Sequence, residues 1–308
     1  MKSSRPEHKY PQPFPPLRLW HIVAALFTCV FLVSLPAYRT YHLEAEAAYR
    51  NSYLQRFEKF SDRSDAGDKG LRVIAIGSSL MAYAIMPDQA FEELASEKLM
   101  SLKFLHLARP CAVLEDFKLF FEKVLDVRPS IILLESDSVF YHRCEKGFLK
   151  SYPDFLREAV RKSLKVKRPA LPEPHINTYA NIRDDVPRLQ AVKKSAGRIK
   201  KSVASFNRRT LVGFDEVGTF FSEAAKRGVR VALVDVRRSP EFEALAGDYK
   251  SDRAALFERL RSEYRITMVA FPEEMASEFY ADPAHMNEAG RKRFSQWLVK
   301  ELKLMAES

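Results

Sequence analysis

Residues 72–81 read RVIAIGSSLM, a short apolar run that ends in one glycine and two serines. An apolar run of this length predicts a buried strand, and the small residues after it predict a tight turn into a helix. Such a turn exposes a hydroxyl at the edge of a sheet and points the first N–H groups of the helix at an anion. Ser79 is therefore a candidate nucleophile, although Gly-Ser-Ser also fits a plain helix N-cap.

Short apolar runs alternate with helical patterns along the rest of the chain. We expect further strands at Lys103–Leu107, Ser130–Leu134, Val229–Val234 and Arg265–Phe271. We expect helices at Asp88–Lys98, Val113–Val124, Phe214–Lys226 and Arg253–Glu263, and from Asn287 onward. This alternation predicts an α/β fold, a flavodoxin-like three-layer sandwich with a parallel central sheet covered by helices on both faces. In such sheets, ligands bind at the carboxyl ends of the strands, where Ser79 is expected.

A second polar stretch lies near the C-terminal end, where residues 281–290 read ADPAHMNEAG. Asp282 precedes His285 by three residues with a proline between them, which predicts a tight turn. The turn can bring the carboxylate to Nδ1 of the imidazole and leave Nε2 as a general base. Taken alone, the pattern equally fits a helix-capping aspartate beside a surface histidine.

The Gly-Ser-Ser-Leu of residues 77–80 and the Asp-x-x-His of residues 282–285, on an alternating α/β framework, resemble the SGNH/GDSL hydrolase superfamily. The resemblance covers residues 71–306 and implies an SGNH-like catalytic domain. It also implies that Ser79 is the nucleophile, that His285 is the base, and that Asp282 orients the histidine. Ser78 stands where the family usually has an aspartate, and it is a candidate oxyanion or substrate contact beside the nucleophile.

Two positions depart from the family's pattern, and both concern the oxyanion hole. The second block usually has a glycine that donates its N–H; here Cys111 and Ala112 follow the strand, and either backbone N–H is a candidate. The third block usually has an asparagine; residues 135–138 read ESDS, so the hydroxyls of Ser136 and Ser138 are the candidates. Losing one donor typically costs about 10²–10³ in rate. The sequence therefore leaves undecided whether the site is slow, specialised or inactive.

The N-terminal region reads as a membrane segment. Leu19–Leu35 carries no formal charge, and with the next three residues it is long enough, at about 1.5 Å per residue, to cross a bilayer core of about 30 Å. Basic residues are enriched before it, so the positive-inside rule places the N-terminus in the cytoplasm. A cleaved signal peptide is the alternative, because Ser34–Ala37 offers small residues near a cleavage site.

These features divide the chain into segments. We expect a cytoplasmic tail at 1–18, a transmembrane helix at 19–38, and a polar stalk and linker at 39–70, followed by the domain at 71–306. A basic insertion interrupts that domain at 150–206. The protein is therefore expected in the inner, cytoplasmic membrane, with its C-terminal domain periplasmic or extracellular.

With one N-terminal membrane helix and an outward-facing domain, this chain resembles a subgroup of the superfamily. Members of that subgroup are similar to accessory proteins that O-acetylate or D-alanylate cell-envelope polymers. This resemblance implies a polysaccharide acceptor and a multi-spanning membrane acyltransferase as the acyl donor. A simple esterase or deacetylase is the first alternative. A non-catalytic scaffold or anionic-polymer-binding protein with the same fold is the second.

The net charge of +10 is concentrated in one region, because residues 141–210 hold 18 Lys and Arg against 6 Asp and Glu. An anionic polymer or anionic lipid headgroups could bind there, and a solvated basic face is the plain alternative. The candidate contacts are Lys193, Lys194, Lys200 and Lys201. Nucleic acid is not expected as a partner of an exported domain.

Other charged and metal-binding patterns are sparse. Asp235 ends the fourth strand beside Arg237 and Arg238; it could line the cleft, but we favour a surface ion pair. The histidines and cysteines show no metal-ligand spacing, and no glycine-rich phosphate loop is present, so we expect no metal and no cofactor.

Overall fold

The computed structural model describes residues 17–62, 70–98, 100–142, 156, 188–207, 209–247, 251–272 and 274–307. The strands are β1 (Leu71–Gly77), β2 (Leu102–Ala108), β3 (Ile131–Glu135), β4 (Arg230–Asp235) and β5 (Thr267–Ala270). They form one parallel sheet in the order β2-β1-β3-β4-β5. The five predicted strands are confirmed. The direction of strand addition reverses between β1 and β3, which is where flavodoxin-like sheets bind their ligands.

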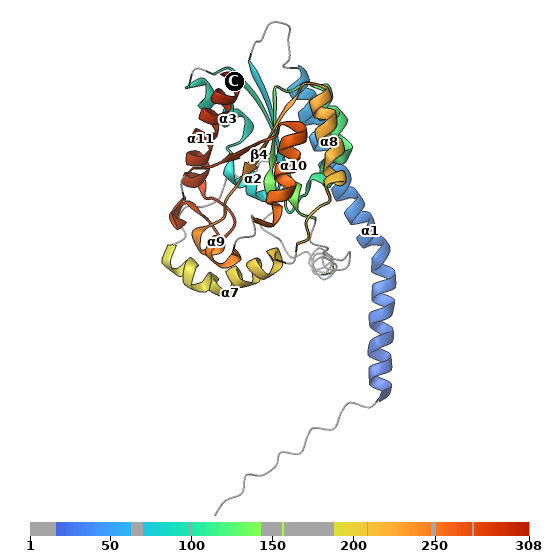
Figure 1. Ribbon diagram of the computed structural model, residues 1–308. Helices are drawn as coiled ribbons and strands as arrows, with labels where there is room; N and C mark the ends of the chain where they lie inside the picture. The colour runs from blue at the N-terminus through green and yellow to red at the C-terminus, as the bar shows by residue number, and fades with distance from the viewer. Residues whose placement is uncertain are drawn as a thin grey trace, which may run out of the picture. The chain divides into compact units, whose positions relative to one another are not determined.

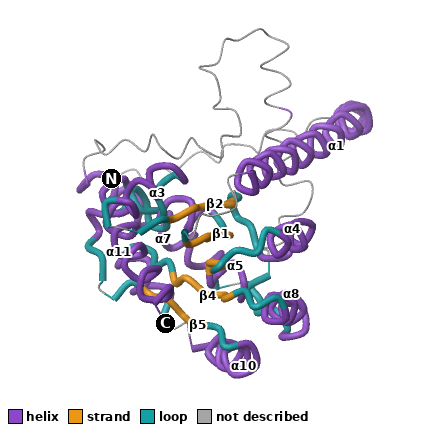
Figure 2. Tube along the Cα trace, turned by 90° about the horizontal axis from the view of Figure 1, so that it is seen from above, coloured by secondary structure: helices purple, strands orange, loops and turns teal. Residues whose placement is uncertain are grey.

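Helices cover both faces of this sheet. The helices of the described residues are α1 (Leu17–Asp62), α2 (Ser79–Ala84), α3 (Asp88–Ser96), η1 (Leu114–Phe120), α4 (Phe121–Asp126), α5 (Ser136–Phe140), α7 (Arg188–Phe206), α8 (Phe214–Lys226), α9 (Pro240–Ala246), η4 (Ser251–Arg253), α10 (Ala254–Tyr264), η5 (Ser277–Phe279) and α11 (Glu288–Glu307). Figure 1 shows their order along the chain, and in Figure 2 α3 and α11 lie over one face while α4, α8 and α10 lie over the other. The predicted three-layer α/β fold is confirmed.

Strand β1 explains why the stretch at 72–81 is so informative. Ile74 and Ile76 pack into the core on the side of α4 and α8, whereas Val73 and Ala75 pack into the core on the side of α3 and α11. A strand that is buried on both faces needs apolar residues at every position, and so it reads as a continuous apolar run.

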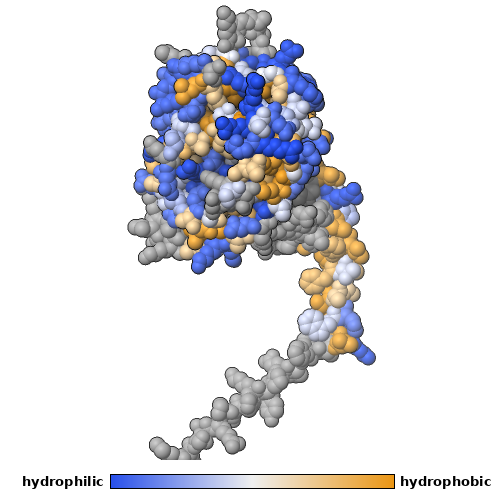
Figure 3. Space-filling model, in the orientation of Figure 1, coloured by the Kyte–Doolittle hydropathy of each residue, from blue (hydrophilic) through white to orange (hydrophobic). Residues whose placement is uncertain are grey.

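Helix α1 contributes to both compact units of the chain, which are residues 1–51 with 148–166 and residues 52–147 with 167–308. Its segment Leu17–Thr40 has a mean hydropathy of 2.0 and is long and apolar enough to cross a membrane. Large hydrophobic side chains cover the exposed surface of this segment (Figure 3). A signal sequence near the N-terminus would have the same composition, so both sequence interpretations stay open.

The last turns of α1 belong to the second unit. Tyr53, Phe57 and Phe60 are buried in its core, and the Tyr53 ring lies 6.0 Å from that of Phe117 and 5.4 Å from that of Phe120. The region 39–70 is therefore not a stalk and linker throughout. The helical pattern of this region is mostly polar in sequence, because its contacts with the core come from a narrow stripe of aromatic residues.

The end of the predicted basic insertion also belongs to the domain. On α7, Ile199, Val203 and Phe206 are buried, and the Phe206 ring meets that of Phe242 on α9 at 5.9 Å. Among the predicted polymer contacts, Lys200 and Lys201 are exposed on α7. The side chains of Lys193 and Lys194 lie outside the described residues.

Candidate active site

Ser79 is the first residue of α2 and follows the carboxyl end of β1. Ser78 caps this helix: its Oγ accepts the N–H of Leu80 at 3.2 Å, and its carbonyl accepts the N–H of Ala82 at 3.1 Å. The first residue of a helix has no acceptor within the helix. In the part of the chain that the structure describes, no other acceptor binds the Ser79 N–H. Both the hydroxyl and the N–H of the candidate nucleophile are thus placed for a substrate.

The two polar stretches singled out in the sequence meet in space. His285 Nε2 lies 2.9 Å from Ser79 Oγ, although the residues are 206 positions apart. On the other side of the ring, Nδ1 lies 2.8 Å from Oδ2 of Asp282 and 3.0 Å from Oδ1. These distances match the nucleophile–base–carboxylate arrangement of a serine hydrolase.

A tight turn holds Asp282 and His285 together. Asp282 Oδ1 accepts the backbone N–H of Ala284 at 2.8 Å and that of His285 at 3.0 Å. Just beyond, Asn287 caps α11 by accepting the N–H of Gly290 at 3.0 Å. Burial acts to raise the pKa of Asp282, but the hydrogen bonds to His285 and Ala284 outweigh it and hold the pKa below its usual value. Asp282 is therefore an anion at neutral pH.

Replacing Asp282 with asparagine tests this orientation. The amide Oδ1 can still accept the two backbone N–H groups, but its NH₂ would favour the tautomer in which Nε2 carries the proton. We expect kcat for ester cleavage to fall by about 10³–10⁴-fold with little loss of stability. Asp126→Asn, at an exposed ion pair with Arg227, is the matched control. A kcat within a few-fold of wild type in Asp282→Asn would contradict the assigned role.

Tyr83 is a contact of the histidine that the sequence did not reveal. Its ring lies 4.5 Å from the His285 ring, at an interplanar angle of 37°. Arg291 of α11 stands behind it, with its guanidinium carbon 5.8 Å from the Tyr83 ring and its Nε donating to the Tyr83 carbonyl at 3.3 Å. Burial, followed by the charge of Asp282, raises the pKa of Tyr83, so the phenol stays neutral beside His285. The imidazole is thus fixed on one face as well as at both nitrogens.

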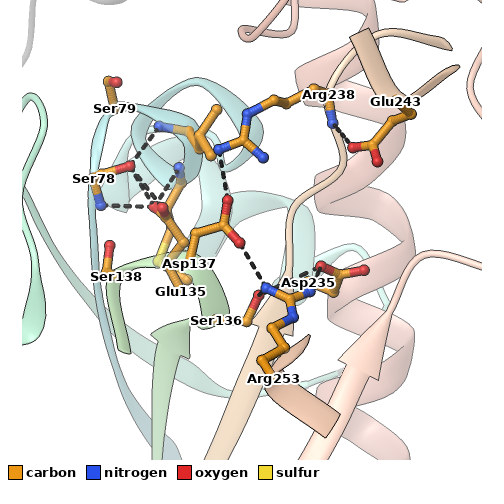
Figure 4. Close-up of polar contacts among 12 residues, drawn as sticks. Ser78, Ser79, Glu135, Ser136, Asp137, Ser138, Asp235, Arg238, Glu243 and Arg253 are labelled. Carbon is orange, nitrogen blue, oxygen red and sulfur yellow. Dashed lines mark hydrogen bonds and ion pairs between the residues drawn. The ribbon is translucent and has the colours of Figure 1, made fainter. Parts of the chain in front are cut away.

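Glu135 ends β3 and contacts the turn that carries Ser79 (Figure 4). Its carboxyl group accepts hydrogen bonds from the N–H and the hydroxyl of Ser78 and from the N–H of Met81. Gly77 permits this approach, because a Cβ there would lie 2.8 Å from Glu135 Cβ and Oε2. The sequence showed Glu135 only as part of a departure from the family's third block.

Asp137 is the centre of a buried ion network beside this turn. It binds Arg238 and Arg253, each at 2.6 Å, and Arg253 also binds Asp235 at 2.9 Å (Figure 4). Burial acts to raise the pKa of Asp137, but the two arginines hold it below its usual value. The interpretation of Asp235 as a surface ion pair is wrong: it is 7% exposed and its partner is Arg253, 18 residues further on.

The candidate oxyanion donors are placed unequally. The Ser138 hydroxyl donates to the Ala112 carbonyl at 3.2 Å, and the Ser136 hydroxyl lies within the ion network, 3.4 Å from Asp235. The Ala112 N–H donates to the Arg109 carbonyl at 3.1 Å. Cys111 is exposed and has a positive φ of 57°, which makes the turn sharp without a glycine. The Ser79 N–H, by contrast, has no acceptor among the described residues.

Local sequence signals account for part of this site. Residues directly after buried strands, such as Glu135 and Asp137, can be predicted to lie at the ligand-binding edge. Arg253 and Tyr83 carry no comparable signal, because each lies within a helical pattern. Among the described residues, no group of three or more His, Cys, Asp or Glu side chains is arranged to hold a metal ion.

Comparison with known proteins gives only distant likenesses. No family model and no curated protein matches this chain. A GDSL-like lipase from Bacteroides thetaiotaomicron is similar in structure, with 12% identity over 85% of this chain and 99% of that chain and a TM-score of 0.41. A psychrotrophic esterase from Pseudoalteromonas sp. is 9% identical over 77% and 99%, with a TM-score of 0.39. AlinE4, an SGNH-hydrolase family esterase, is 11% identical over 78% and 98%, with a TM-score of 0.35.

The strand order β2-β1-β3-β4-β5 shows the fold of this chain. The chemistry is likewise inferred from the distances that join Ser79, His285 and Asp282.

Proposed function

We propose that this protein is a serine-dependent acyl-transfer enzyme or esterase of the SGNH type. The observation that carries the proposal is the contact of Ser79 Oγ with His285 Nε2 at 2.9 Å, with Asp282 at 2.8 Å from Nδ1. A serine hydroxyl is a weak nucleophile by itself, and an adjacent base oriented by a third group activates it.

The reaction follows from this geometry. Ser79 Oγ attacks the carbonyl carbon of an acyl ester while its proton passes to His285 Nε2, and the carbonyl oxygen becomes an oxyanion that the Ser79 N–H can bind. Collapse of the tetrahedral intermediate breaks the ester C–O bond, and His285 returns the proton to the departing alcohol. The acyl-enzyme is then attacked by a hydroxyl group, whose proton passes to His285 and finally to Ser79 Oγ.

The finer proposal concerns the acceptor. We infer that α1 anchors the protein in the cytoplasmic membrane with the domain outside, and that a sugar hydroxyl of a cell-envelope polysaccharide accepts an acetyl group. The apolar segment Leu17–Thr40 supports the anchor, and the resemblance to outward-facing polymer-modifying proteins supports the acceptor. A multi-spanning membrane acyltransferase would supply the acyl group.

The test uses the full chain in detergent micelles with a chromogenic acetyl ester and a panel of envelope oligosaccharides. We expect oligosaccharide to increase ester turnover and to emerge acetylated, in a manner that depends on Ser79. Hydrolysis that depends on Ser79 but is indifferent to every acceptor would instead establish an esterase or deacetylase. No turnover that depends on Ser79 would contradict the proposal and favour a non-catalytic scaffold.

A further inference from the structure

The end of strand β3 places a buried acid against the nucleophile turn. Glu135 is 1% exposed and belongs to the strand that pairs with β1 on the side opposite β2. It therefore lies at the reversal of strand order, where the substrate of a flavodoxin-like sheet is expected. The mechanism proposed for Ser79 assigns this side chain no role, yet burying a carboxyl group costs stability unless it is well hydrogen-bonded.

Among the described residues, the side-chain hydrogen bonds of Glu135 all go to the turn around Ser79. Oε2 accepts the Ser78 N–H at 2.7 Å and the Met81 N–H at 3.2 Å, and Oε1 lies 2.7 Å from the Ser78 hydroxyl. The Ser78 oxygen in turn accepts the N–H of Leu80. One carboxyl group thus holds residues on both sides of Ser79 but does not bind Ser79 itself.

This pattern of acceptors determines which N–H group stays available. The first N–H groups of a helix all point toward its N-terminal end and lack acceptors within the helix. Glu135 and Ser78 take those of the residues around Ser79, while the Ser79 N–H has no acceptor among the described residues. The turn is therefore held so that, among the described residues, the N–H of Ser79 beside the hydroxyl keeps no acceptor.

We propose that Glu135 is a positioning residue for the Ser79 reaction, one that fixes the nucleophile turn through Ser78 and Met81. This inference rests on the proposed function of Ser79. The acid acts as a hydrogen-bond acceptor of fixed position, and Gly77 gives it the space to reach the turn.

This role does not require the Glu135 carboxyl group to be ionised. Burial raises the pKa of Glu135, as does the nearby Asp137, while the hydrogen bonds from Ser78 and Met81 lower it, and the net direction is upward. Glutamine has the same shape, and its carbonyl can accept both N–H groups while its NH₂ donates to the Ser78 oxygen. It is therefore the conservative variant that should retain the position of the turn.

The experiment compares Glu135→Gln and Glu135→Leu in the full chain in detergent micelles. Three quantities are measured: kcat and KM for a chromogenic acetyl ester, the rate at which a fluorophosphonate probe labels Ser79, and the thermal unfolding midpoint. Leucine removes the acceptor, and we expect kcat and the labelling rate to fall by about 10²-fold with KM little changed, as for a misplaced reacting group. Glutamine should restore most of both.

A matched control is Glu92→Gln. The Glu92 carboxylate also accepts a backbone N–H from a strand, that of Phe104 at 2.8 Å, and it lies outside the proposed site. We expect its kcat to equal that of wild type.

The outcomes separate this inference from the proposed function. A wild-type kcat in folded Glu135→Leu would overturn the inference, and so would a glutamine variant as slow as the leucine variant. If the leucine variant does not fold, Glu135→Asp decides, since it retracts the carboxyl group by one methylene; an unchanged kcat there overturns the inference. If wild type itself shows neither turnover nor labelling at Ser79, the proposed function fails and the inference fails with it.

Discussion

Replacing Ser79 with alanine should lower the kcat for acetyl-ester cleavage by at least about 10⁴-fold, because it removes the atom that forms the covalent bond to the acyl group. His285→Ala should cost a similar factor, since the serine then has no acceptor for its proton at 2.9 Å. Residues that act as one unit lose activity together. We therefore expect the double variant to be no slower than the slower single variant.

Two measurements check this prediction. Ester turnover gives the rate, and mass spectrometry of the intact chain detects an acyl adduct on Ser79 that the alanine variant lacks. Ser96→Ala is the matched control, because Ser96 is an exposed serine of α3 whose hydroxyl donates to the Glu92 carbonyl of the same helix. An adduct that persists in Ser79→Ala, or full turnover in His285→Ala, would contradict the mechanism.

Replacing Asp137 with alanine should lower the free energy of unfolding by about 3–5 kcal/mol, the usual cost of removing one partner from a buried ion pair. Two arginines, Arg238 and Arg253, lose the carboxylate that they share at 2.6 Å. The Arg238 guanidinium also lies over the Phe206 ring at 4.5 Å, so the loss should spread to α7. Denaturant unfolding of wild type and variant measures the difference.

The pH dependence gives this second prediction a further check. Because the pKa of Asp137 is below its usual value in the folded protein, its contribution to stability is fully present above the unfolded value of about 3.9. The contribution is lost as the pH falls through the lower, folded pKa. The difference in unfolding free energy between wild type and Asp137→Ala should therefore be constant near neutrality and should narrow below about pH 4.

The control is Asp126→Asn, at an exposed ion pair, whose unfolding free energy should differ from that of wild type by nearly zero. A loss below about 1 kcal/mol in Asp137→Ala would mean that the network does not stabilise the fold.

The elements of this fold were predictable because their signals are local. The strand at Leu71–Gly77 is buried on both faces and shows as a continuous apolar run, whereas the helix at Phe214–Lys226 is amphipathic and shows the helical period; both signals lie within a short window of sequence. The turn at residues 282–285 was predictable for the same reason, since its hydrogen bonds join neighbours.

The missing parts of the site depend on contacts that are distant in sequence. Arg253 lies 116 residues from Asp137, and Glu135 lies 57 residues from Ser78, so no window of sequence relates them. The aromatic stripe of Tyr53, Phe57 and Phe60 has a local period but is masked by the charged residues around it. Its burial depends on η1, which supplies the opposing rings.

The contact between Gly77, Ser78 and Glu135 also limits how this chain can change over evolutionary time. An aspartate at position 78, which the SGNH pattern would favour, would place a second carboxylate against Glu135, where the Ser78 hydroxyl now lies within 2.8 Å of both carboxyl oxygens. A side chain at position 77 would occupy the space that Glu135 fills. In homologues, the residues at these three positions should therefore change together. A survey of sequences would detect them as a covarying group in which an acid stands at position 78 or at position 135, but not at both.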